Sequence, residues 1–226
     1  MAEKRSKIKF LFFILIVIGL VVFAYLTRGL YYRAITIHEL LTENKQLKKA
    51  ITNLTNEEQI GYARVISQDT KDGKLFTTIR FVETARDDKL KKILEKEYTI
   101  EGDIVHFDAL IVKFGNKMVM DGKSKALYFW RRVYGEKMNP QDGFLIEQQG
   151  TEPQRYKDLL KALPLGHRQL FWSNIWELAN DIDKLKKYDI EAIYGSVVYS
   201  KLREGIIYIF KISPTGQLYI EVAPDM

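Results

Sequence analysis

The chain has 226 residues, with 35 Lys and Arg, 29 Asp and Glu, and no cysteine. The lack of cysteine excludes a disulfide framework and any cysteine-based metal site. Residues 1–35 hold six basic residues and one acidic residue, so only +1 of the net charge of +6 belongs to residues 36–226. Because a nearly neutral domain attracts a phosphate backbone weakly, we expect no nucleic-acid partner.

Residues 10–26 form an apolar run, FLFFILIVIGLVVFAYL, with no charge, no amide and no proline. At about 1.5 Å per residue, a helix of this length is near the minimum for crossing about 30 Å of hydrocarbon. Lys9 and Arg28 extend the usable length, because their side chains can snorkel. Large residues follow the run where a signal peptidase needs small ones. We therefore predict a retained signal-anchor over residues 10–28 rather than a cleaved signal.

The basic residues around this run predict its orientation. Four of them lie within residues 4–9, ahead of the run, and two, Arg28 and Arg33, follow it. The larger number is expected on the cytoplasmic side, so residues 1–9 are predicted to be a cytoplasmic tip. The predicted location is the plasma (inner) membrane, crossed once, with the C-terminal domain periplasmic or extracellular. Membrane lipid is then a partner of the basic flank.

Residues 29–58 are expected to form a stalk between the membrane and a folded domain. Helix formers fill residues 35–54, without glycine or proline. β-Branched residues at position a with Leu at d of a seven-residue repeat are typical of a parallel two-stranded coiled coil. Asn44 is the polar exception among the a positions. Its amide would pair with Asn44 of the second helix and so disfavour other registers. The predicted homodimer contacts are Ile37, Leu40, Asn44, Leu47, Ile51 and Leu54. Two alternatives are open: the helix packs on a helix of a partner protein, or on its own domain.

Residues 61–226 are predicted to form an extracytoplasmic α+β domain. Alternating patterns bounded by turn residues predict strands over 61–68, 74–83, 104–114, 126–135, 190–200, 205–213 and 217–223. The turn-rich residues 69–73 predict a hairpin, and the charge of residues 86–97 predicts a short helix or loop. Helices are expected over 153–163 and 167–187. This order predicts a mainly antiparallel β-sheet or small barrel domain with helices.

One candidate catalytic group lies in the strand expected over 104–114. His106 and Asp108 share one face of an extended strand, and Asp103 lies in the turn just before it. A carboxylate beside a histidine could orient it as a general base, which would make the domain a membrane-anchored hydrolase or ligand-processing domain. The alternative is ordinary turn chemistry and a solvated sheet face. No nucleophile-elbow, zinc or phosphate-binding motif is present, so we expect no metal and no cofactor, and favour a protein that is not an enzyme.

Residues 128–134, YFWRRVY, form a second candidate site. Regular alternation would place Trp130 and Arg132 on one face and Arg131 on the other. Aromatic rings flanked by guanidinium groups can stack on sugar rings or hold an acidic partner. We therefore take Trp130, Arg131 and Arg132 as the predicted partner-binding residues. The alternative is that the rings belong to the core and the arginines pair with acidic neighbours.

The order of short tip, single span, coiled coil and external β-rich domain resembles bacterial envelope scaffolds such as the rod-shape protein MreC. The heptads from about 37 to 54 also look like those of bitopic division proteins of the FtsB/FtsL kind. This resemblance implies a non-enzymatic assembler. The first hypothesis is a scaffold or adaptor that dimerises through its stalk and binds an envelope protein or wall polymer. A tethered sensor is a third option.

Overall fold

The computed structural model describes residues 17–20, 23, 25, 42–148, 150–156, 172, 175, 181–187 and 190–225. The chain divides into two compact units, Met1–Lys49 and Ala50–Met226. In the first unit, the described residues are helical and exposed. The second unit begins with helical residues 50–55 and continues as a β-rich domain.

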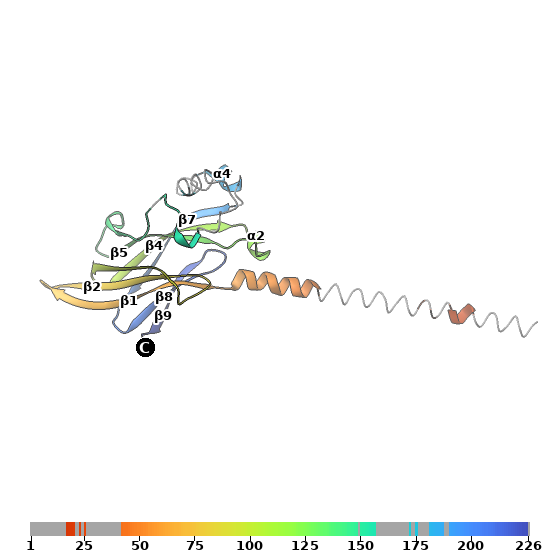
Figure 1. Ribbon diagram of the computed structural model, residues 1–226, viewed down its shortest axis with the longest axis horizontal. Helices are drawn as coiled ribbons and strands as arrows, with labels where there is room; N and C mark the ends of the chain where they lie inside the picture. Colours follow the sequence, from red (N-terminus) through yellow and green to blue (C-terminus); the bar gives the residue numbers. More distant parts are fainter. Residues whose placement is uncertain are drawn as a thin grey trace, which may run out of the picture. The chain divides into compact units, whose positions relative to one another are not determined.

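The second unit is a mainly antiparallel β-sheet domain with few helices in its described part (Figure 1). Its elements are β1 (Glu58–Lys71), β2 (Lys74–Thr84), β3 (Lys92–Glu101), β4 (Ile104–Phe114), α2 (Asn116–Met120), β5 (Leu127–Gly135), η1 (Pro140–Asp142), β6 (Phe144–Leu145), η2 (Gln154–Tyr156), α4 (Ile182–Lys187), β7 (Ile190–Lys201), β8 (Ile206–Ile212) and β9 (Leu218–Pro224). The coarse prediction of an antiparallel β-sheet domain is therefore confirmed.

The strands form two sheets, one of five strands in the order β3-β2-β1-β8-β9 and one of four in the order β6-β5-β4-β7. Every pairing is antiparallel. The closing strands do not stay together: β7 joins β4 in the four-stranded sheet, whereas β8 and β9 extend the five-stranded sheet beside β1. Among the described strands each sheet ends in two edge strands, so the domain is a two-sheet sandwich rather than a closed barrel.

The hairpin of β1 and β2 follows directly from its sequence. Register pairs run from Lys71 with Lys74 at the tip to Gly61 with Glu83 at the base. The two tip residues, Asp72 and Gly73, have φ of 50° and 74°, as the two-residue turns favoured by Asp-Gly require. The predicted hairpin is confirmed, with a shorter turn than residues 69–73 suggested.

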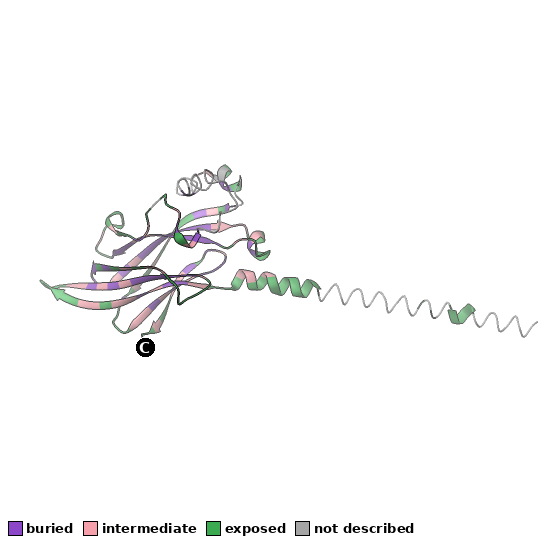
Figure 2. Ribbon diagram, in the orientation of Figure 1, coloured by how far each residue is buried: buried purple, intermediate pink, exposed green. Residues whose placement is uncertain are grey.

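The main core lies between the two sheets, and both contribute large side chains to it. Figure 2 shows buried stretches on the strands of both sheets. Phe81 of β2 is fully buried and packs against aromatic rings on three other strands. Its ring centroid lies 5.2 Å from that of Trp130, 5.7 Å from that of Phe210 and 5.8 Å from that of Phe107. Stacked, edge-to-face and tilted contacts of this kind contribute stability beyond the apolar area that each ring buries.

A second, smaller core covers part of the outer face of the four-stranded sheet. Its members are Leu110, Val112, Leu127, Phe129, Tyr156, Trp172, Ile175, Leu185, Ile190 and Ile193. Three of them belong to the region between 157 and 189, which the structure describes only in part. The two helices predicted over 153–163 and 167–187 lie mostly outside the described residues. Within them, residues 154–156 form η2 and 182–187 form α4.

The prediction for residues 86–97 holds for the loop at 86–91 and was wrong for 92–97, because Lys92–Glu101 forms the edge strand β3. Tyr98 and Ile100 face the core, while the charged residues pair across the exposed face. Arg80 of β2 donates to Glu97 at 2.6 Å. Charged side chains paired across neighbouring strands support a sheet as apolar ones do, so a high density of charge was not evidence against a strand.

The predicted membrane span over residues 10–28 falls largely outside the described residues, as do Ile37 and Leu40 of the stalk. Within the described part of the chain, no helix combines the length and hydropathy that a bilayer crossing needs. Asn44, Leu47 and Ile51 are helical and exposed, and Leu54 is half-buried.

The helical residues 50–55 are held against the domain that follows them. The Asn53 side-chain amide donates to the carbonyl of Met120 in α2 at 2.8 Å. The Thr55 hydroxyl donates back to the Ile51 carbonyl at 2.9 Å. Residues 56 and 57 connect this helix to β1.

Candidate functional site

His106 and Asp108 lie on the outer face of β4, as the alternation of the strand predicted. The sheet register places His106 between Tyr134 of β5 and Tyr199 of β7. The His106 ring is nearly parallel to that of Tyr134, with centroids 4.9 Å apart, and lies 5.6 Å from that of Tyr199. Three rings from three strands therefore form one row across the sheet.

The neighbouring row holds the arginines and differs from the predicted alternation. A bulge opposite Asp108 and Ala109 inserts Arg131 into β5. Trp130 consequently points inward and is fully buried between the sheets, where it cannot contact a partner. Arg131 and Arg132 both remain half-buried outside that core. A bulge puts two residues opposite one, which is why a strict two-residue period failed here.

The carboxylates near His106 are engaged with cations rather than with its imidazole. Asp108 Oδ2 lies 3.2 Å from Arg131 Nε, and Asp103 Oδ2 lies 3.3 Å from Lys201 Nζ. Burial raises the pKa of Asp108, while the charges of Arg131 and Arg132 act in the opposite direction. A general base needs an orienting partner within hydrogen-bond reach, and these ion pairs direct both carboxylates elsewhere.

We call His106, Arg131, Arg132, Tyr134 and Tyr199 the aromatic–arginine patch. It occupies the part of the outer sheet face that the second core, as far as its described residues go, does not cover. Tyr199 is its most accessible member, with 70% of its surface exposed, whereas Tyr134 is largely buried beneath its neighbours. The patch presents rings and guanidinium groups on a rigid sheet, which suits contact with sugar rings or acidic groups.

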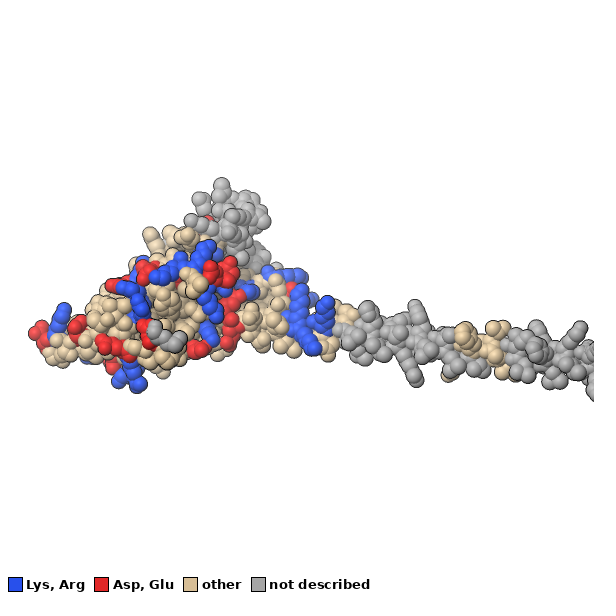
Figure 3. Space-filling view, turned by 60° about the horizontal axis from the view of Figure 1, so that its bottom comes forward, with Lys and Arg blue, Asp and Glu red and all other residues tan. Residues whose placement is uncertain are grey.

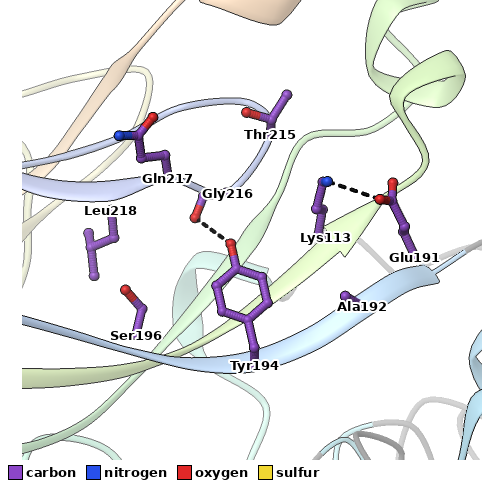
Figure 4. A pocket seen from close by; sticks show the side chains of 9 residues that line it. All are labelled: Lys113, Glu191, Ala192, Tyr194, Ser196, Thr215, Gly216, Gln217 and Leu218. Carbon is purple, nitrogen blue, oxygen red and sulfur yellow. Dashed lines mark hydrogen bonds and ion pairs between the residues drawn. The ribbon is translucent and has the colours of Figure 1, made fainter.

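A groove of about 500 Å³ lies on another side of the domain, between β7 and the connection from β8 to β9 (Figure 4). The Tyr194 hydroxyl donates to the Gly216 carbonyl across it at 3.0 Å. Lys113 Nζ and Glu191 Oε1 form an ion pair at one end, 2.9 Å apart. This groove could not be predicted from the sequence, because it lies where the rims of the two sheets meet, and the strand order decides which rims those are.

A buried polar cluster was also missed. Arg155 is 3% exposed at its side chain and lies 2.9 Å from Glu83 Oε1 and 2.5 Å from Glu147 Oε1. Its guanidinium lies 4.5 Å from the ring centre of Tyr128, and its Nη2 donates to the Tyr128 carbonyl at 2.8 Å. One signal was available in the sequence: Glu83 follows Ile79 and Phe81 at two-residue spacing, which places it on the inward face of β2.

This buried cluster is structural rather than a ligand site. The cavity beside it, lined by Trp130, Glu147 and Trp172 among others, measures about 20 Å³. A space of this size admits about one water molecule. The cluster therefore ties the segment carrying Glu147 and Arg155 to the sandwich.

Figure 3 shows basic and acidic side chains interspersed over the displayed face of the second unit, in keeping with its low net charge. Within the described ranges, no group of three His, Asp or Glu side chains could hold a metal ion. Comparison of the chain with known protein families, with curated proteins and with solved structures finds no match.

Proposed function

We propose that this chain is a single-pass, membrane-anchored adaptor of the cell envelope. It dimerises through its stalk and binds an envelope protein or a wall polymer with the aromatic–arginine patch of its external domain. The carrying observation is the division of the outer sheet face: one part is covered by the second core, and another part holds the patch, where Tyr199 is 70% exposed.

The exposed stalk positions support the dimer. Leu47 is 60% exposed and Ile51 is 58% exposed in the single chain, and both belong to the predicted a and d seam. Burying a side chain of this size contributes about 1.5–3 kcal/mol, so a second stalk covering these positions stabilises the pair. A parallel copy of the helix would bury these a and d side chains, and no contact with the core of the domain is needed.

A Cys scan of the stalk tests the dimer in membranes. Leu47→Cys at position d should form a disulfide-linked dimer, because d side chains of a parallel pair meet. Lys49→Cys, at the outward position f, is the matched control and should stay monomeric under the same oxidation. The chain contains no native cysteine, so every product reports the introduced one. Absence of cross-linking at both positions would remove the stalk dimer from the proposal.

Binding by the patch is tested with the full chain and an insoluble wall polymer. The unmodified chain should co-sediment with isolated wall polysaccharide, and Tyr199→Ala combined with Arg132→Ala should reduce the bound fraction at least fivefold. Tyr219→Ala with Lys211→Ala, on the five-stranded sheet, is the control and should bind normally. If the polymer does not retain the unmodified chain, the wall polymer is removed from the proposal, and cross-linking of the same variants to an envelope protein becomes the test of the patch.

The hydrolase alternative receives no support from the geometry. Asp108 is paired with Arg131 and Asp103 with Lys201, while the ring contacts of His106 are with tyrosines. This arrangement stacks the imidazole rather than orienting it towards a substrate proton.

A further inference from the structure

The groove of about 500 Å³ carries polar side chains at positions that face the interior of the sandwich. The sheet register pairs Tyr194 with Ile111 and Ser196 with Ala109. Opposite residues of an antiparallel pair share a face, and Ile111 and Ala109 belong to the main core between the sheets. Tyr194 and Ser196 therefore point inward. Tyr194 is still 38% exposed, because β7 is an edge strand and the groove lies open beside it.

The wall opposite β7 is the connection from β8 to β9, and hydrogen bonds fix its shape. The Gly216 N–H donates to the Ser213 carbonyl at 3.0 Å, and the Gln217 N–H donates to the Ser213 hydroxyl at 2.9 Å. The Pro214 carbonyl accepts from the Ala126 N–H at 2.9 Å, which ties the connection to the residue before β5. Because both walls are already ordered, a ligand entering the groove has little ordering cost to overcome.

The groove carries no net charge. Its two ionic side chains, Lys113 and Glu191, form an ion pair of 2.9 Å at one end and neutralise each other. An ionic ligand therefore gains no net electrostatic attraction there, in contrast to the aromatic–arginine patch with its two guanidinium groups. The other residues that line the groove are uncharged at neutral pH: Ala192, Tyr194, Ser196, Thr215, Gly216, Gln217 and Leu218.

Neutral hydrogen-bonding groups stand on both walls of the groove. The Ser196 hydroxyl lies on β7, while the Thr215 hydroxyl and the Gln217 amide lie on the connection. Hydroxyl and amide groups both donate and accept hydrogen bonds. Gln217 is exposed and Ser196 is half-buried, so both are accessible to a ligand. A molecule whose own groups also donate and accept, such as one rich in hydroxyls, matches these walls.

Tyr194 supplies a flat apolar surface within this polar groove. Figure 4 shows its ring between Ser196 and Leu218 on one side and the ion pair on the other. Its hydroxyl donates to the Gly216 carbonyl at 3.0 Å, so the ring is held in one orientation. An aromatic ring fixed in this way can stack on the C–H face of a sugar ring, as a floppy side chain cannot without an entropic cost.

We propose that the groove binds a neutral saccharide unit, with one sugar ring on the face of Tyr194 and its hydroxyls bonded to Ser196 and Gln217. The groove volume lies within the range of about 300–1,000 Å³ typical of small-ligand sites. An apolar ligand would leave the hydroxyls and the amide of the walls without partners. An ionic ligand would have to compete with the ion pair of Lys113 and Glu191. A neutral molecule rich in hydroxyls avoids both costs.

This site goes beyond the proposed function, because it is separate from the aromatic–arginine patch. Tyr194 points to the inner face of the four-stranded sheet, whereas Tyr199 contacts His106 on the outer face. Binding of a short neutral saccharide needs neither the stalk nor the membrane span. A polymer held at both sites loses avidity when either site is removed, so the patch variants still lower co-sedimentation.

Ligand-observed NMR titration of the detergent-solubilised full chain tests the site. The probes are soluble tetrasaccharides of glucose, mannose, galactose and N-acetylglucosamine. At least one of them should bind with a dissociation constant on the order of 1 mM or lower. Tyr194→Ala should weaken that binding at least about tenfold through loss of the stacking face, and Gln217→Ala about fivefold through loss of a hydrogen bond. Failure of all these probes to bind overturns the proposal.

Two further variants separate binding from folding. Tyr194→Phe keeps the aromatic face but loses the bond to Gly216, so its affinity should stay within about twofold of the original. Gln217 is exposed, so Gln217→Ala reports on the site even if Tyr194→Ala destabilises the domain. A Gln217→Ala chain and a Tyr194→Ala chain that both bind as the unmodified chain does would place the saccharide outside the groove.

Tyr199→Ala is the matched control, because it removes a tyrosine from the same strand on the other face. It should bind the neutral probe as the unmodified chain does. Loss of binding in this variant alone would assign the saccharide to the patch and overturn the groove site. Tighter binding of an anionic probe, tetragalacturonate, through Tyr194 would overturn the neutral ligand. Failure of the patch in co-sedimentation leaves the neutral titration unchanged, so the two proposals fail separately.

Discussion

The hydroxyl of Tyr128 donates a hydrogen bond to Glu83 Oε1 at 2.8 Å, from the four-stranded sheet to the five-stranded sheet. Glu83 is fully buried, and Arg155 lies on the same carboxylate oxygen. Because one guanidinium serves both Glu83 and Glu147, the cluster holds more carboxylates than cations. This imbalance makes the stability of the domain depend on pH.

Replacing Glu83 with Gln should remove part of that pH dependence. Burial raises the pKa of Glu83 to about 7, with Arg155 opposing the shift and Glu147 adding to it. The unfolded chain ionises this group near pH 4.3, so between those values only the folded state holds the proton. The unfolding free energy therefore falls as pH rises towards 7, by about 3 kcal/mol from this group.

Urea unfolding of the full chain between pH 5 and pH 8 measures this slope. Glu83→Gln stays neutral throughout and should flatten it. Glu97→Gln, exposed on β3, is the control and should keep the original slope. A Glu83→Gln chain with an unchanged slope would contradict a protonated Glu83 at pH 5–7.

Arg155→Met should destabilise the domain strongly, by about 3–5 kcal/mol, because it removes the buried cation that pairs with Glu147 and with the ionised form of Glu83. Arg80→Met is the matched control: Arg80 pairs with Glu97 on an exposed face, where an ion pair contributes at most about 1 kcal/mol. Chemical unfolding at neutral pH compares the two. Similar losses of unfolding free energy in the two variants would show that the buried Arg155 cluster contributes no more to stability than an exposed ion pair.

Gly216→Ala tests the fit of the β8–β9 connection against the four-stranded sheet. Gly216 has φ of +95°, and an added Cβ would lie 2.9 Å from Ile111 Cγ2 and 3.1 Å from the Tyr194 hydroxyl oxygen. We expect a loss of at least about 2 kcal/mol from backbone strain and contact together. Gly205→Ala, with φ of +73° and open space around it, separates the two causes and should cost about 1 kcal/mol. Equal losses would remove the contact with Tyr194 and Ile111 from the explanation.

Asn44→Leu tests the predicted stalk through the oligomeric state of the chain. A buried amide at position a fixes register and oligomer state at a cost in stability. The leucine variant should therefore associate more tightly but give a mixture of dimers and larger species. Light scattering of the detergent-solubilised chain measures this distribution, with Gln46→Leu at the outward position c as the control. A purely monomeric Asn44→Leu chain would count against a coiled-coil stalk.

The strands were predictable where local pattern and tertiary context agree. The β1–β2 hairpin follows from alternation on both sides of Asp72 and Gly73. β3 was missed because its apolar face is short and its charged face looks like a solvated loop. The pairing of Arg80 with Glu97 turns those charges into cross-strand contacts, and only the neighbouring strand reveals this.

The candidate sites show the same division. His106 and Asp108 on one face could be read from the period of a strand. Trp130 could not be placed, because the bulge at Arg131 depends on how β5 meets Asp108 in β4. The groove and the free edge of β7 depend on strand order, which no local pattern records.

The connection between the helical residues 50–55 and β1 is short. Asn53 is bonded to Met120, and residues 56 and 57 alone separate the helical turn from β1. The helix at residues 50–55 therefore cannot rotate freely relative to β1, the central strand of the five-stranded sheet. Gly122 lies beside this contact, and a methyl group there would meet the Asn53 amide at 3.0 Å, so a larger residue at 122 would disturb the bond that ties the helix to α2.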